Sequence, residues 1–136
     1  MIKKIFIVLL TVGFFGCTKK QSELLDCPAQ PCTLLFASIS VQFQDKNGNA
    51  VEVKNFTAVN QRTNETLSSG SPGLNGTGYT IADDGMRSKL STKGDDVVVT
   101  ATHPTNGQIK TATYKISGGC NCHVDKISGP QIIAFD

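Results

Sequence analysis

Apolar and polar residues alternate along residues 37–43, and this is the clearest pattern in the chain. In the stretch ASISVQFQD, apolar side chains occupy every second position, and serine or glutamine fills the positions between them. A period of two places the apolar side chains on one face of an extended strand. The cluster DKNGN at residues 45–49 is typical of a turn. The pattern therefore predicts a half-buried strand that ends in a turn.

The alternation resumes at Val51 and Val53 but changes parity at Phe56. A shift of one residue turns every following side chain to the opposite face. The change therefore predicts a β-bulge or a break near Lys54 and Asn55. The run NQRTNET that follows has the composition of a second turn.

Five more strands are expected in the second half of the chain. A short strand with two tight turns lies within YTIADDGMRSKLSTKGDD, and DDVVVTATH and IKTATYKI are strongly β-forming runs. Asn106 and Gly107 lie between these two runs and tolerate positive φ, so a two-residue hairpin turn is expected. The tail CNCHVDKISGPQIIAFD is expected to add one strand, a Gly-Pro break and a last apolar strand.

About seven short strands in roughly a hundred residues predict an all-β fold, a single antiparallel, immunoglobulin-like β-sandwich. The glycine-rich run SSGSPGLNGTG at residues 68–78 is expected to be a long flexible loop that crosses between the two sheets. This crossover disfavours an up-and-down barrel. The run lacks the preceding strand and following helix of a phosphate-binding loop, so phosphate binding is not expected.

The first residues, MIKKIFIVLLTVGFFGCTKK, have a different pattern. Lys3 and Lys4 precede an uncharged apolar run at residues 5–15, which is shorter than the about 20 residues of a membrane-spanning helix. Its length is that of the apolar region of an export signal. An ordinary export signal that is cleaved elsewhere, or a buried N-terminal strand, would also have this pattern.

The apolar run ends at Gly16 and Cys17, and polar residues follow at once. This junction resembles the lipobox of bacterial lipoproteins, in which the cysteine is acylated and the signal is cleaved before it. Phe14 and Phe15 stand where a lipobox usually has an aliphatic and a small residue. The resemblance implies a lipoprotein signal peptide at residues 1–16 and a lipid anchor at Cys17. Several acyl chains on one cysteine are sufficient for stable anchoring.

Residues 17–32 are interpreted as a lipid-anchored spacer, because TKKQSELLDCPAQP is polar, contains proline and has no sustained period. The β-sandwich domain is then expected at residues 33–136. By analogy with Gram-negative lipoproteins, Thr18 directly after the anchor favours the outer membrane, on its periplasmic face or at the cell surface. The membrane, through Cys17, is the expected partner.

Cleavage of the signal changes the charge balance. The whole chain has 13 basic and 11 acidic residues, and removal of Lys3 and Lys4 brings the net charge near zero. No basic field remains to attract nucleic acid, so nucleic acid is not an expected partner. Tryptophan is absent and aromatic residues make up 7%, so an aromatic platform for sugars or bases is not evident. No cofactor is expected.

The segments ISVQFQDKNGNAV, NQRTNETL and GYTIADDGMRSKLSTKGDDVVVTAT form a recognisable series. An alternating strand, Asp and a Gly turn, a T-x-E-T turn, Y-x-I, D-G and G-D-x-V-x-V are similar to carboxypeptidase-regulatory-like domains of Bacteroidota lipoproteins. The resemblance covers about residues 37–102. It implies a transthyretin-like sandwich but no particular activity, because such sandwiches are reused for many roles.

Four cysteines follow the predicted anchor: Cys27, Cys32, Cys120 and Cys122. An even number in an exported chain favours disulfides over free thiols. A bond between Cys120 and Cys122 in an extended segment would span roughly 6.6 Å between Cα atoms, near the limit for a disulfide. The two pairings that join the N-terminal pair to the C-terminal pair remain, and both stay open.

The motif C-N-C-H at residues 120–123 also suggests a metal site or a redox pair. In an extended strand His123 would point away from both cysteines, so one ion would not reach all three side chains. The gap between the cysteines is shorter than in zinc-binding pairs, and redox C-x-x-C motifs belong at a helix start. We therefore expect disulfides and no metal.

Other candidate chemistry is sparse. Asp83 and Asp84, and likewise Asp95 and Asp96, suggest calcium ligands, but each pair adjoins a glycine in a predicted turn, where aspartate suits the backbone. A hydrolase would need His103 or His123, and no nucleophile motif assembles around either.

The sequence as a whole predicts a non-enzymatic cell-envelope lipoprotein. Its disulfide-linked β-sandwich is expected to serve as a binding or structural module for an envelope protein or glycan. An accessory subunit of a larger envelope complex and a small envelope hydrolase are the alternatives.

Overall fold

The computed structural model describes residues 27–70, 72 and 78–136. The predicted signal peptide, Cys17 and the first part of the spacer lie outside the described residues, as do residues 71 and 73–77 of the glycine-rich run. In the part of the chain that is described, no helix is long and apolar enough to cross a membrane.

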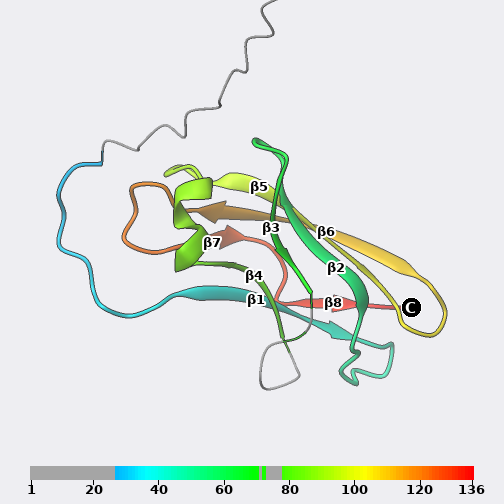
Figure 1. Ribbon diagram of the computed structural model, residues 1–136. Helices are drawn as coiled ribbons and strands as arrows, with labels where there is room; N and C mark the ends of the chain where they lie inside the picture. Colours follow the sequence, from blue (N-terminus) through cyan, green and yellow to red (C-terminus); the bar gives the residue numbers. More distant parts are fainter. Residues whose placement is uncertain (1–26, 71, 73–77) are drawn as a thin grey trace, which may run out of the picture.

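The protein is an all-β sandwich, as the sequence predicts (Figure 1). One sheet has the strand order β3-β2-β5-β6-β7, and the other has the order β4-β1-β8. The strands are β1 (Ser38–Gln44), β2 (Lys54–Asn60), β3 (Glu65–Ser69), β4 (Tyr79–Asp83), β5 (Asp95–Thr102), β6 (Ile109–Ser117), β7 (Asp125–Ser128) and β8 (Ile132–Ala134). The described residues thus hold eight strands. The unexpected one is β3, which buries only Leu67 and so shows no alternation.

The chain crosses from one sheet to the other in the glycine-rich run, as expected, because β3 and β4 belong to different sheets. The strand pairs are antiparallel except β1 and β8, which are parallel. The sandwich is thus predominantly antiparallel, as predicted, and this pair is the exception among the described strands. Residues 129–131 carry the chain from β7 to the opposite sheet instead of turning it back beside β7, and Gly129 adopts a φ of 124° in this passage.

The alternation of apolar and polar residues determines which faces of β1 and β2 contact the core. The apolar positions of β1 are buried, and the polar residues between them are exposed. The register of β2 against β5 shifts between Lys54 and Thr57, and Asn55 has a positive φ of 52°. The predicted change of parity near Lys54 and Asn55 is therefore confirmed.

β5 and β6 form the expected hairpin, but its turn is longer than two residues. The loop spans residues 103–108, and the N–H of Gly107 donates to the carbonyl oxygen of His103 at 3.2 Å. In this loop only Gly107 has a positive φ, so Asn106 does not take part in the predicted two-residue turn. Pro104 holds its own φ near −65°, which favours a right-handed turn that the glycine then closes.

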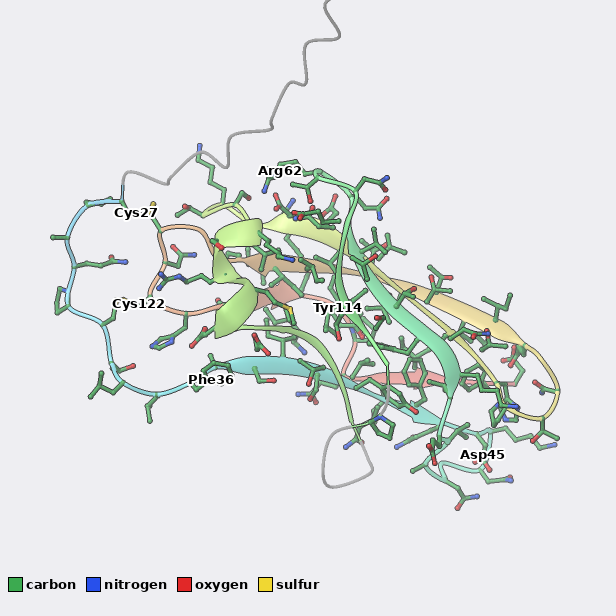
Figure 2. All side chains as sticks on the ribbon, in the orientation of Figure 1. Cys27, Phe36, Asp45, Arg62, Tyr114 and Cys122 are labelled. Carbon is green, nitrogen blue, oxygen red and sulfur yellow. A yellow bond between two sulfur atoms is a disulfide. The ribbon has the colours of Figure 1, made fainter. Side chains whose placement is uncertain are left out.

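The helical element of the described chain is a short 3₁₀ helix, η1 (Asp84–Lys89), between β4 and β5. Asp83 caps it, because its Oδ1 accepts the N–H of Gly85 at 2.9 Å. We call residues 27–37, η1 and residues 118–124 the stapled end of the sandwich. The turn at residues 45–49 and the loop at residues 103–108 form the distal end. Figure 2 shows Cys27 and Cys122 at the stapled end and Asp45 at the distal end.

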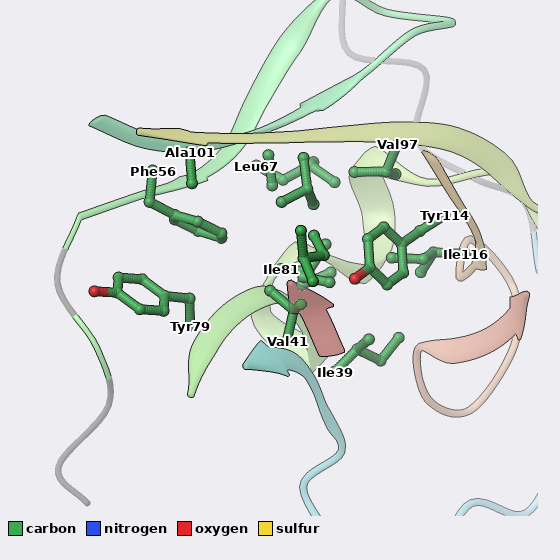
Figure 3. Packing of buried hydrophobic residues seen from close by; sticks show 14 of the residues in the cluster. Ile39, Val41, Phe56, Leu67, Tyr79, Ile81, Val97, Ala101, Tyr114 and Ile116 are labelled. Carbon is green, nitrogen blue, oxygen red and sulfur yellow. The ribbon is translucent and has the colours of Figure 1, made fainter. Parts of the chain in front are cut away.

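Aromatic rings fill the core between the two sheets toward the distal end. The ring centroid of Phe43 lies 6.2, 5.4 and 6.0 Å from those of Phe56, Tyr79 and Phe135. Aliphatic side chains from both sheets continue the core toward Tyr114 (Figure 3). Burial of these side chains is the main force that joins the sheets.

Candidate functional site

Two disulfide bonds tie the segment before β1 to the loop between β6 and β7 (Figure 2). Cys27 is bonded to Cys120 with Cα atoms 5.2 Å apart, and Cys32 is bonded to Cys122 with Cα atoms 5.3 Å apart. This is one of the two cross-pairings that the sequence left open. Residues 27–32, interpreted from the sequence as spacer, are therefore bound to the domain.

The C-terminal cysteines lie in a loop, residues 118–124, and β7 begins only after it. The expectation of an extended segment with both cysteines on one strand face is wrong. The cause is the glycine pair that precedes them. Gly119 has a φ of 58°, and its N–H donates to the carbonyl oxygen of Arg87 in η1 at 2.7 Å. A Cβ at Gly118 would lie 2.7 Å from the same oxygen, so glycine permits this close packing on η1.

Polar side chains satisfy the carbonyl oxygens of the two loop cysteines. Nε2 of Gln30 donates to the carbonyl oxygen of Cys120 at 2.6 Å. Nη1 of Arg87 donates to the carbonyl oxygen of Cys122 at 3.0 Å. The stapled segment and the loop are thus held by hydrogen bonds as well as by the covalent bonds.

A chain of hydrogen bonds links Asp84 to His123 and Thr33. Oδ2 of Asp84 lies 2.7 Å from Nδ1 of His123, and Nε2 of His123 lies 2.7 Å from Oγ1 of Thr33. The same carboxylate accepts the N–H of Ala37 at 2.9 Å and the N–H of Val124 at 2.8 Å. One side chain of η1 therefore holds both the segment before β1 and the loop between β6 and β7.

These contacts lower the pKa of the Asp84 carboxyl to about 2. The hydrogen bond from the N–H of Ala37 is the largest cause, and His123 and the N–H of Val124 add to it, whereas desolvation opposes it. Hydrogen bonds to the charged form of an acid favour that form. Asp84 is therefore a carboxylate at neutral pH and holds all three donors at once.

The order carboxylate, imidazole and hydroxyl occurs in nucleophilic hydrolases, where the imidazole takes the hydroxyl proton. Here the hydroxyl belongs to Thr33, and Asp84 also binds two backbone amides, which fastens chain segments together. The hydrogen bonds of Asp84 and His123 join the segment before β1 to the loop between β6 and β7.

A second polar cluster is built on Asp95, which is buried at the start of β5. Its carboxylate accepts hydrogen bonds from Arg62 at 2.8 and 2.9 Å, from Asn60 at 2.7 Å and from the N–H of Ser91 at 3.0 Å. Burial alone would raise the pKa of Asp95. The hydrogen bonds, with that of Arg62 the largest, outweigh burial and hold this pKa well below its ordinary value.

His103 lies at the distal end, in the loop between β5 and β6, whereas His123 lies at the stapled end. Its Nδ1 accepts the N–H groups of Thr105 at 3.2 Å and Asn106 at 3.3 Å, and its ring contacts Phe135. The residue is partly buried. These hydrogen bonds hold the turn that directly follows His103.

The remaining candidates from the sequence do not converge on one place. Asp83 and Asp84 act as a helix cap and a fastener, while Asp95 pairs with Arg62. Within residues 27–70, 72 and 78–136, no group of three His, Cys, Asp or Glu side chains could hold a metal ion. The predicted lipidation site Cys17 lies outside the described residues.

One surface feature was missed in the sequence. Leu34, Leu35 and Phe36 are all exposed, in the segment between Cys32 and β1. The available signal is that these three apolar residues are consecutive, whereas the apolar residues of the following strand alternate.

Comparison with known proteins gives no match: no family model, curated protein or solved structure corresponds to this chain.

Proposed function

We propose that the protein is a non-enzymatic cell-envelope lipoprotein, in which acylated Cys17 anchors a stapled β-sandwich that serves as a binding or structural module. The observation that carries the proposal is the pair of disulfides formed by Cys27 and Cys32, which follow the predicted anchor Cys17 in the chain. Disulfides form and persist in oxidising compartments such as the periplasm and the cell surface. The export signal in the sequence supports the same location.

The disulfides also suit a domain that is displayed from a membrane. Any pull on the tether reaches Cys27 first and passes through its bond into the β6–β7 loop. The hydrogen-bonded ladder of β1, which lies further along the chain, is therefore spared. A sandwich attached in this way keeps its fold while it binds a partner away from the membrane.

The variant Cys17→Ala tests the anchor. In cells, this variant should leave the membrane fraction and become soluble, and mass spectrometry of the parent protein should find acyl chains on Cys17. The double variant Cys27→Ser with Cys120→Ser is the matched control, because it removes a cysteine pair but should remain in the membrane fraction. A Cys17→Ala protein that stays membrane-bound, together with an unacylated parent, contradicts the proposal.

Peptide mapping without reduction tests the compartment. Protein isolated from the envelope should yield the linked peptides of Cys27 with Cys120 and of Cys32 with Cys122. Free thiols at these four positions in the envelope protein would contradict the assignment to an oxidising compartment.

A second candidate function, an accessory subunit that accepts a strand from a larger envelope complex, is favoured by the edge of β1. β8 pairs only with Gln42–Gln44 of β1, and the N–H of Gln42 donates to Gln131. Alternate residues direct their backbone groups to the same side, so the N–H of Ser40 faces a hollow lined by β1, β7 and Gln131. An extended peptide could pair with this edge in the manner of β-augmentation.

The variant Ser40→Pro distinguishes this candidate, because proline removes the N–H that an added strand would bind. A partner cross-linked to the parent protein in envelopes, but not to Ser40→Pro, would support an accessory subunit. The variant Lys46→Pro, in the turn at the distal end, controls for general effects of proline, because the Lys46 N–H has no hydrogen-bond partner among the described residues. Equal cross-linking of parent and Ser40→Pro would exclude this edge.

A further inference from the structure

Three consecutive apolar side chains are exposed to solvent at the stapled end. Leu34 is fully exposed, Leu35 is 76% exposed and Phe36 is 70% exposed. Figure 2 shows Phe36 at this end of the sandwich, below Cys122. Single exposed apolar residues are ordinary on a protein surface, but a contiguous exposed group marks a site of interaction.

This apolar segment, residues 34–36, is fastened at both of its ends. Directly before it, Cys32 is bonded to Cys122 and the neighbouring threonine contacts the imidazole. Directly after it, the N–H of Ala37 donates to Asp84, and β1 begins at the next residue. The segment is therefore presented in one place, and binding through it costs little further ordering of the chain.

The predicted anchor keeps a lipid surface within reach of this segment. Cys27 follows Cys17 by ten residues, and a fully extended chain of that length spans at most about 35 Å. Cys27 is bonded to Cys120 at the stapled end, so this end stays near the bilayer while the distal end is free to point away. Tethering of this kind raises the effective concentration of the membrane at the segment.

We propose that residues 34–36 insert into the interface of the bilayer beside the lipid anchor and so fix the orientation of the domain. The inference rests on the proposed anchoring through Cys17. Leucine and phenylalanine side chains are the kind that enter the boundary between headgroups and acyl chains. With the acyl chains as the first contact and the apolar segment as the second, the stapled end faces the membrane and the distal end faces away.

The absence of tryptophan from the chain allows a direct test. Phe36→Trp places one fluorophore in the segment, and Ile109→Trp places one at an exposed site at the start of β6, roughly 26 Å along the strand from its stapled end. The full acylated proteins are incorporated into phosphatidylethanolamine and phosphatidylglycerol vesicles that contain brominated lipid. We expect blue-shifted emission and strong quenching for Phe36→Trp and neither for Ile109→Trp.

Equal, weak quenching of the two variants in acylated protein overturns the inference and leaves the anchor standing. A blue shift of Phe36→Trp without quenching by brominated lipid also overturns it, because another protein surface then covers the segment. Adding Leu34→Ser and Leu35→Ser to Phe36→Trp should lower the quenching markedly, whereas adding Ile109→Ser should not.

The same fluorescence assay separates the failure of the anchor from failure of the inference. If mass spectrometry finds Cys17 unacylated, the proposed function fails, and the Cys17→Ala form of Phe36→Trp is titrated with the vesicles. Saturable quenching then supports insertion of the segment by itself, with an affinity roughly tenfold or more above that of the form with both serine substitutions. No quenching up to high lipid concentration overturns the inference in this arm too.

Discussion

The stapled end and the aromatic core of the sandwich are held by different forces. At the stapled end, two disulfides and the hydrogen bonds of Asp84 secure residues 27–37, while three apolar side chains remain in water. In the core, Phe43 and its neighbouring rings are buried from water and contact one another. The segment before β1 thus adds almost nothing to the core and is attached by covalent and charge-assisted bonds. The two regions should therefore fail under different perturbations.

Removal of both disulfides should have the largest effect on stability. One bond between residues 93 positions apart is worth about 4–5 kcal/mol in the chain-entropy estimate, and the second closes only a short additional loop worth about 2 kcal/mol. Cys27→Ser with Cys120→Ser should therefore cost about 2 kcal/mol, and replacement of all four cysteines about 6–7 kcal/mol. Urea denaturation measures both. If the loss of one disulfide lowers the free energy of unfolding as much as the loss of both, the estimate for the two bonds is wrong.

Phe43→Ala should destabilise the sandwich without affecting the disulfides. The loss of the central ring of the aromatic cluster leaves a cavity, with an expected cost of about 3–5 kcal/mol. Ile109→Ala is the control at an exposed apolar position and should change stability by about 0.5 kcal/mol or less. If both variants cost the same, the aromatic cluster does not dominate the core.

Acid should weaken the stapled end through Asp84. Its pKa is about 2 in the folded protein and about 3.8 when unfolded, so the unfolded state binds more protons between these values. The stability that Asp84 contributes is complete above about pH 4 and is lost as the pH falls toward 2. Unfolding measured between about pH 5 and 2 should show a steeper decline in the parent than in Asp84→Asn. The Asp95 carboxyl is present in both proteins, so its effect on the dependence of stability on pH is common to them. Parallel curves of stability against pH would therefore show that Asp84 contributes nothing to stability.

Thr33→Val should have a small cost at the stapled end. It removes the hydroxyl that bonds to His123 but keeps the shape of the side chain, so a loss of about 0.5–1.5 kcal/mol is expected. Faster amide hydrogen exchange at Ala37, with unchanged exchange in β5, would place the effect in the stapled segment. An unchanged rate at Ala37 would show that the hydroxyl does not support this segment.

Tyr114→Phe should have the smallest effect and the opposite sign. The Tyr114 hydroxyl is buried and has no hydrogen-bond partner among the described residues, and burial raises its pKa. Replacement of an unpaired buried hydroxyl by hydrogen should raise stability by up to about 1 kcal/mol. A destabilised Tyr114→Phe protein in thermal unfolding would reveal that the hydroxyl is bonded after all.

Local patterns explain which parts of the fold were predictable. The alternation of β1 and the change of parity in β2 appear in single short segments, and the structure has both. β3 buries a single residue and so has no alternation to reveal it. Asn106 and Gly107 predict a two-residue turn after β5, and Pro104 favours a longer one. Residues 118–124 form a loop instead of the expected extended segment because their glycines pack on η1, about 30 residues earlier, and no local pattern reveals that contact.

The all-β class, the positions of most strands and the presence of four cysteines suited to two cross-links follow from the sequence, because each depends on residues that are neighbours along the chain. The tertiary structure alone decided that Cys27 pairs with Cys120, that β8 runs parallel to β1, and that Asp84 fastens two distant segments. These contacts join residues that are about 40 to 93 positions apart. No local pattern records which distant residues meet, because that follows from how the two sheets pack around a shared core.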